Sequence, residues 1–199
     1  DVTHGDLDTI HNTLRGLNQQ DFNAVVDRMS NSQLEHLSNE MNGIVNGYSP
    51  AERREFFDTF AGRANANNLN RLLNQTSNEH DVNSLGEAIA ANSPDQVAAD
   101  FALQASRNLR ADSSNGVAVA QALGGLGDNP ALLERTLQNI NDSDLNKVIS
   151  QATRKRTNVS TSPYGGGHIT TSYHSEPLAN LVNATAKIND SNTQARIFR

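Results

Sequence analysis

Apolar residues recur with helical spacing along most of the chain, and short polar runs interrupt them. The clearest example is Leu132–Val148, where two sets of apolar residues flank the polar run Asn141-Asp142-Ser143-Asp144. A Ser or Asp at the end of such a run can accept hydrogen bonds from the exposed amides of a helix's first turn. The segment therefore predicts a helix–turn–helix hairpin whose two apolar stripes face each other.

The spacing of this hairpin recurs at three other places in the chain. Offsets of 7, 12 and 15 positions reach apolar residues from each of three starting residues: Ile140, Leu145 and Val148 from Leu133; Met29, Leu34 and Leu37 from Phe22; and Ala64, Leu69 and Leu72 from Phe57. Near the C-terminus the spacing holds from Leu181 to Ile188 and then fails at Thr193 and Arg196. Because the copies are unevenly spaced, we expect a degenerate array of helix hairpins rather than a solenoid of fixed period. Chance coincidence in an all-helical chain is the alternative.

Pairs of a capping residue and a proline mark further helix starts. Ser49-Pro50 is followed by Glu52, which predicts an N-cap, a proline in the first turn and a third-position acid. Ser93-Pro94 and Asn129-Pro130 predict two more starts by the same logic. The small apolar segment Val117–Leu126 should form the most buried helix, with its two glycines either allowing close helix approach or fraying its end.

The segment from Thr157 to His174 differs in kind from the rest of the chain. Thr, Val, Ser and Tyr replace Leu and Ala, and Pro163–Gly167 suits a turn. We expect a β-hairpin here that interrupts the helical array and leans on the helices or on a partner. Loops that interrupt a rigid scaffold often carry binding residues. The residues expected to form a recognition hairpin are Tyr164, His168, Thr170, Tyr173 and His174.

Composition supports an all-α domain and excludes several functional classes. Trp is absent and aromatic residues make up 5%, so Leu, Ile, Val and Ala must fill the core of a single domain spanning residues 1–199. The net charge of -6 argues against nucleic-acid binding. Without cysteine, disulfides and thiolate sites are excluded. No apolar run approaches the roughly 20 residues of a transmembrane helix. The start at Asp1, without Met, suggests a domain excised from a longer protein.

Motifs for catalysis or metal binding do not emerge from the residue spacing. The glycines before His168 lack the Lys and Ser/Thr offsets of a phosphate-binding loop. His4 and His11 would lie about 10 Å apart on a helix, too far to share one ion. His36 and Glu40 could both coordinate a metal, but the sequence offers no evident third ligand. We therefore predict no catalytic residue, no cofactor and no metal site.

Three stretches carry a resemblance to a broader class of proteins: NPALLERTLQNINDSDLNKVISQAT, the Ser/Thr/Gly/Tyr-rich insert, and EPLANLVNATAKINDSNTQARIF. Together they resemble the Leu/Ala/Asp-rich helical-repeat regions of large secreted bacterial proteins, which sit beside toxin or cell-wall-hydrolase modules. The resemblance covers about two thirds of the chain and consists of composition and spacing. It implies a non-catalytic module of a secreted effector and transfers no functional residue.

The sequence leaves three functional hypotheses open. The first is a non-enzymatic helical interaction or delivery module of a secreted bacterial effector or toxin, with a protein partner. The second is a hydrolase acting on cell-wall or other polar polymers, with a site near residues 164–174. The third is a cytoplasmic immunity or inhibitor protein that binds a basic partner through its acidic surface. The partner, the oligomeric state and the organism are not encoded in any pattern we identify.

Overall fold

The computed structural model describes residues 3–42, 47–110, 113–153, 155–160, 168–173 and 176–198, with backbone alone for 155–160 and 168–173. The predicted all-α class is confirmed. The described helices are α1 (His4–Gly16), α2 (Gln19–Arg28), α3 (Asn31–Met41), α4 (Pro50–Arg63), α5 (Ala66–Gln75), α6 (Glu79–Asn92), α7 (Asp95–Arg107), α8 (Asn115–Gly125), α9 (Pro130–Asn139), α10 (Asp142–Ala152), α11 (Glu176–Thr185) and α12 (Ser191–Ile197). A 3₁₀ turn, η1 (Leu126–Asp128), follows α8.

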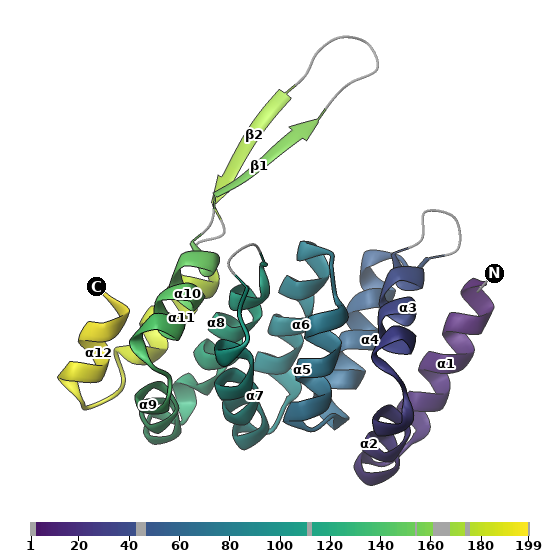
Figure 1. Cartoon of the computed structure of the whole chain (residues 1–199), viewed down its shortest axis with the longest axis horizontal. Coiled ribbons are helices and arrows are strands. Elements are labelled where there is room, and N and C mark those ends of the chain that lie inside the picture. The colour runs from purple at the N-terminus through teal and green to yellow at the C-terminus, as the bar shows by residue number, and fades with distance from the viewer. Residues whose placement is uncertain are drawn as a thin grey trace.

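The helices stack into an elongated array with the two termini at opposite ends (Figure 1). One row is formed by α1, α4, α6, α8 and α11, each packed against the next, and the other row by α2, α5, α7, α9 and α12. Helices α3 and α10 are additional members that pack against α5 and α8 respectively. Buried apolar residues form one continuous core from Leu7 in α1 to Ile197 in α12.

A common unit of two helices underlies this array. In four units the N-cap of the second helix follows that of the first by 15 or 16 positions: Thr3 and Asn18, Ser49 and Asn65, Asn78 and Pro94, Ser114 and Asn129. The pairs α4–α5 and α6–α7 start 29 positions apart at both helices. The chain is therefore built from short helix pairs. A polar N-cap side chain accepts from the first turn in six of these eight helices, whereas α7 and α8 have no such bond.

A larger duplication relates helices α1–α3 to helices α8–α10. We call these two groups the three-helix units. The N-cap positions of α1, α2 and α3 are Thr3, Asn18 and Ser30, and those of α8, α9 and α10 lie 111 positions later, at Ser114, Asn129 and Asn141. The predicted equivalence of the hairpins starting at Phe22 and Leu133 is thus confirmed. The helix start predicted at the end of the polar run 141–144 lies earlier, because Asn141 itself accepts from the Asp144 amide at 2.9 Å.

The two three-helix units differ in the connection that follows them. Residues 42–49 lead from α3 to α4, whereas residues 153–175 lead from α10 to α11 and include β1 (Lys155–Ser160) and β2 (His168–Tyr173). These strands pair antiparallel, with Thr157 opposite Thr171 and Val159 opposite Ile169. Residues 161–167, which would form the turn, lie outside the described residues, so the hairpin insertion at 157–174 stays a prediction.

Arginine side chains join successive units at equivalent places. Arg71 of α5 donates to the carbonyl of Val26, at 3.0 Å, and to that of Met29 at the end of α2. Arg196 of α12 does the same at the end of α9, where it donates to Leu137, at 2.8 Å, and to Ile140. Each guanidinium thus satisfies carbonyls that a helix end leaves unpaired.

The two positions at which the apolar spacing fails in α12 still face the array. Thr193 is buried, and the Arg196 guanidinium bonds the end of α9. One expectation about an individual residue was wrong. Ser93 does not cap the helix after it. Its hydroxyl donates to the Ala61 carbonyl at 2.8 Å, and Pro94 occupies the N-cap position of α7.

Helix α8 is buried along most of its length, as its small apolar sequence predicts. Every residue from Gly116 to Leu123 is buried, and α8 packs against α6, α7, α10 and α11. Glycines permit this close approach: a Cβ at Gly86 of α6 would lie 2.6 Å from Ala118 Cα, and one at Gly125 would lie 2.8 Å from Ala90 Cα. The glycines at the end of α8 therefore serve helix packing.

Replacing Gly86 by alanine should destabilise the protein because the new methyl group would overlap the α8 backbone. We expect a loss of about 1–3 kcal/mol, which exceeds the roughly 0.5–1 kcal/mol that alanine gains over glycine within a helix. Denaturant unfolding measures the change. Gly16→Ala is the matched control, since a Cβ there meets nothing within 4 Å, and it should be neutral or stabilising. Equal effects of the two substitutions would contradict this account of α8 packing.

Shortening the connection between α10 and α11 should leave the fold intact, because the equivalent connection after α3 joins its helices through residues 42–49 alone. The variant replaces residues 158–173 with a short Gly/Ser linker. Loop length affects closure entropy only weakly, so we expect the free energy of unfolding to change by less than about 1 kcal/mol. Circular dichroism during thermal melting measures this. A collapse of the helical signal would instead mean that the strands pack into the core.

Candidate functional site

Three of the five predicted recognition residues belong to β2. Tyr164 and His174 lie outside the described residues. His168, Thr170 and Tyr173 belong to β2, where their backbones pair with Ser160, Asn158 and Lys155. Their role in recognition therefore stays a prediction.

A polar groove of about 820 Å³ lies over the ends of α3, α5, α7 and α8. It forms where helices of neighbouring units end or begin on the same edge of the array. The residues lining it are Asn31, Glu35, Asn74, Gln75, Thr76, Ser77, Val82, Asn108, Arg110, Ser113, Ser114 and Asn115. Its lining is dominated by carboxamides and hydroxyls because helix ends attract these residue types.

Several of these carboxamides are available to a ligand. Asn31 accepts from Arg71 Nε at 3.2 Å, and Asn108 donates to the Gln104 carbonyl at 3.2 Å, so these two are partly engaged. Within the part of the chain that the structure describes, the side chains of Asn74, Gln75 and Asn115 have no hydrogen-bond partner. A carboxamide carries both donor and acceptor groups, so these three side chains can pair with either kind of polar atom.

The groove adjoins the helix from which β1 departs. Gln151, buried near the end of α10, donates to the Arg110 carbonyl and accepts from the Gly116 amide, both at 2.7 Å. One side chain thus joins the rim of the groove to the helix that precedes β1, which begins at Lys155. The groove and the strand pair therefore share an edge of the array.

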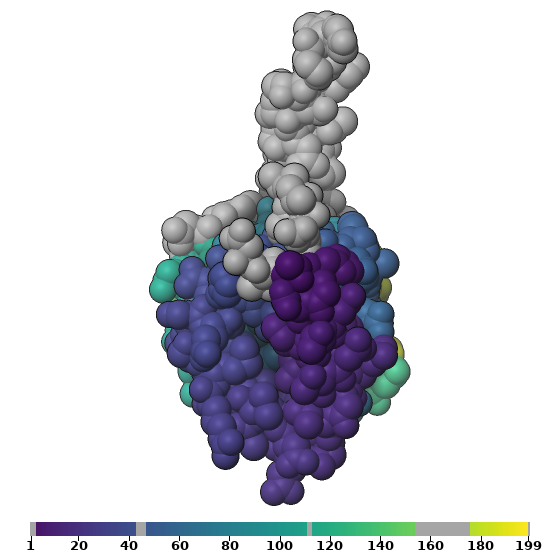
Figure 2. Space-filling view, turned by 90° about the vertical axis from the view of Figure 1, so that its right-hand side faces the viewer, coloured from purple at the N-terminus to yellow at the C-terminus, as the bar shows by residue number. Residues whose placement is uncertain are grey.

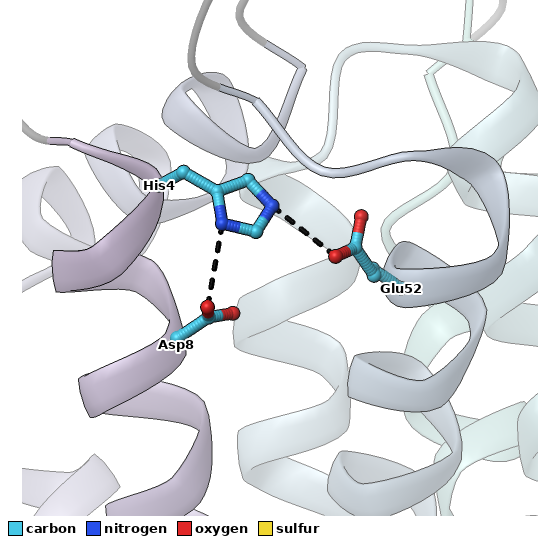
Figure 3. A group of neighbouring side chains, drawn as sticks. All are labelled: His4, Asp8 and Glu52. Carbon is cyan, nitrogen blue, oxygen red and sulfur yellow. Dashed lines mark ion pairs between the residues drawn. The ribbon is translucent and has the colours of Figure 1, made fainter.

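A second polar cluster joins α1 to α4 (Figure 3). His4 Nδ1 lies 3.3 Å from Asp8 Oδ2, and His4 Nε2 lies 3.2 Å from Glu52 Oε1. His4 and Asp8 share one face of α1 because they are four residues apart. Glu52 is held in place by the capping box of α4, in which its Oε2 accepts from the Ser49 amide at 2.8 Å. The distance of Glu52 from His4 and Asp8 along the chain hides this cluster in the sequence, where His4 pairs by helical spacing only with near neighbours such as His11.

The groups around this cluster have shifted acidities. The hydrogen bonds from Ser49, followed by the charge and hydrogen bond of His4, hold the pKa of Glu52 below its usual value. Burial raises the pKa of Tyr48, and the nearby Asp8 carboxylate raises it further. Burial also lowers the pKa of His11, whose Nε2 lies 3.2 Å from the Thr59 hydroxyl oxygen. Glu52 is therefore a carboxylate near neutral pH, while Tyr48 and His11 are neutral.

An apolar hollow of about 320 Å³ lies between α1 and α3 at the N-terminal end of the array. Leu7, Ile10, Met29 and Leu37 contribute most of its apolar lining, and Figure 2 looks directly onto this end. Ile10 is 39% exposed here. Apolar side chains are exposed at this end because, among the described residues, no neighbouring unit covers the first one.

Comparison with protein-family models, curated proteins and solved structures finds no match to this chain. Among the described residues, no helix combines the length and apolar character needed to cross a bilayer.

The burial of His11 should make stability depend on pH. The unfolded chain takes up a proton near the ordinary pKa of 6.5, whereas the folded chain resists it because its pKa is lowered. The stabilising contribution is thus complete above pH 6.5 and is lost as the pH falls below it. The groups facing His11 oppose or add to this effect: Glu55 and Asp8 raise its pKa, while Arg15 lowers it.

Thermal melting at pH 7.5 and 5.5 tests this, with His11→Gln as the variant and His36→Gln, at an exposed position, as the control. The wild type and the control should lose more stability on acidification than His11→Gln. Parallel losses in all three proteins would show that His11 does not titrate differently in the folded state.

Proposed function

We propose that the chain is a non-enzymatic interaction module that binds an extended polypeptide segment in its polar groove. The observation that carries the proposal is the 820 Å³ groove lined with unengaged carboxamides beside the strand pair. Ligand pockets usually have volumes of about 300–1,000 Å³, so this groove can hold several residues of a partner. The strand pair, on the same edge, would extend the contact surface.

The chemistry of the lining favours a polypeptide over an apolar ligand. Each residue of an extended chain presents one backbone donor and one backbone acceptor, and these need partners when they leave water. Asn74, Gln75 and Asn115 each offer both. Glu35 and Arg110 carry opposite charges at the groove, so the lining itself has no strong charge preference. The chain's net charge of -6 disfavours acidic partners at long range.

The second part of the proposal is that the chain is a module of a secreted bacterial effector or toxin. This part rests on the sequence resemblance. In such a protein, a helical array would supply a rigid surface for a delivery or regulatory partner. The hydrolase hypothesis placed its site at residues 164–174, outside the residues whose side chains are described. The groove gives the interaction hypothesis a location among described side chains.

Selection of peptides from a displayed library of random segments, about 12 residues long, tests the proposal directly. Selected peptides are synthesised and their affinities are measured by biolayer interferometry. The double variant Asn74→Ala/Asn115→Ala should bind them about tenfold more weakly or worse, since each lost hydrogen bond contributes roughly 0.5–1.5 kcal/mol. Both side chains lie in the groove lining and have no partner in the described fold, so folding should be unaffected.

The matched control is Gln19→Ala/Gln20→Ala, which removes two exposed carboxamides at the start of α2. This control should retain wild-type affinity. If the groove variant and the control bind the selected peptides equally well, the groove is not the binding site. If no peptide is enriched over the background of the support, binding of extended polypeptides is itself excluded.

A further inference from the structure

Three side chains with metal-binding atoms meet between α1 and α4. One ligand atom each from His4, Asp8 and Glu52 can be chosen so that all three lie within 4.8 Å of one another. Figure 3 shows the His4 ring between the two carboxylates, with one nitrogen towards each. The separation of His4 Nε2 and Glu52 Oε1, 3.2 Å, is close to the roughly 3.3 Å between ligands of a tetrahedral zinc ion.

A buried hydroxyl provides an independent indication at the same place. Tyr48 is 5% exposed, and its hydroxyl has no hydrogen-bond partner of ordinary geometry. The Asp8 carboxylate is near enough to raise the pKa of this hydroxyl, and the Tyr48 ring packs edge-on against His4 with centroids 5.3 Å apart. Buried polar groups are normally paired, so this hydroxyl needs a reason to be here. Donation to a ligating carboxylate would supply one, because ligating carboxylates are usually hydrogen-bonded in turn.

We propose that His4, Asp8 and Glu52 bind a divalent first-row transition-metal ion, with Zn²⁺ as the representative, and that Tyr48 orients Asp8. One imidazole nitrogen and two carboxylate oxygens suit such ions better than Ca²⁺ or Mg²⁺, which prefer oxygen ligands throughout. A single ion binds only one nitrogen of the ring, whereas the two carboxylates face different nitrogens. The side chain of Asp8 or His4 must therefore rotate for all three residues to bind the same ion. Both side chains are partly exposed, at 51% and 41%, which leaves room for the turn and for water on the ion.

The site would fasten the first unit of the array to the second. His4 and Asp8 belong to α1, whereas Glu52 lies in the first turn of α4 and Tyr48 directly precedes the N-cap of that helix. Besides this cluster, α1 and α4 are joined by the exposed Arg15–Glu55 ion pair at 2.7 Å, by the His11–Thr59 contact at 3.2 Å and by a bond of 2.9 Å from Arg63 to the Arg15 carbonyl. An ion that binds the folded but not the unfolded chain stabilises the fold by mass action. Metal binding should therefore raise the melting temperature.

Titration of the full chain with ZnCl₂ in a calorimeter, near pH 7.5 in a buffer that does not bind metal, tests the proposal. One ion should bind per chain. His4→Gln and Glu52→Gln should each weaken binding about tenfold or more, and Tyr48→Phe should weaken it by about tenfold through Asp8. Glutamine at position 52 can still complete the capping box, and phenylalanine removes an unpaired hydroxyl, so these variants should fold.

The control is His36→Gln, because His36 and Glu40 form a similar i,i+4 pair 3.6 Å apart without a third ligand in the described structure. This variant should bind Zn²⁺ like the wild type, and Zn²⁺ should raise its melting temperature equally, whereas His4→Gln should show no rise. The proposal is overturned if the wild type binds no Zn²⁺ at about 100 µM. It is also overturned if His36→Gln loses as much affinity as His4→Gln, or if Tyr48→Phe and Glu52→Gln leave the affinity unchanged.

Discussion

Close packing of α6 and α11 against α8 is the constraint on which the rest of the array depends. Helix α8 lies between α6 and α11 in its row and also packs against α7 of the other row. Its neighbours approach it at positions where Gly86, Gly116 and Gly125 leave no space for a Cβ. Since interiors are packed at nearly crystalline density, larger residues here would shift whole helices. The positions of the outer units follow from this contact.

Polar residues organise the array at the ends of its helices. Asparagine caps α2, α5, α6, α9 and α10, and arginine from one unit bonds the last carbonyls of a helix in another. A protein with many short helices has many such ends, and each leaves backbone groups without partners. The same abundance of carboxamides lines the groove between units. Asparagine therefore serves both to cap the helices and to line the candidate binding surface.

Local signals in the sequence predicted the helices well. Ser49-Pro50 and Asn129-Pro130 start helices because capping depends on a few adjacent residues. Ser93-Pro94 predicts a cap at Ser93, but the Ser93 hydroxyl donates to the Ala61 carbonyl of another helix instead. Arg196 breaks the apolar pattern in the sequence, but its guanidinium reaches carbonyls more than 50 positions away, which no local spacing predicts. The groove and the His4 cluster escaped prediction because they join residues from different units, whose juxtaposition no local spacing encodes.

The duplicated, unit-by-unit construction has a consequence for how the molecule opens. Each unit is held mainly by its neighbours, so amide protons in the terminal helices α1 and α12 should exchange with solvent through local opening, and those of α8 only through global unfolding. The groove draws its lining from α3, α5 and the start of α8, which belong to different units. A segment lying across it would therefore couple openings that are otherwise separate, so that occupancy of the groove slows exchange in helices that the ligand never touches.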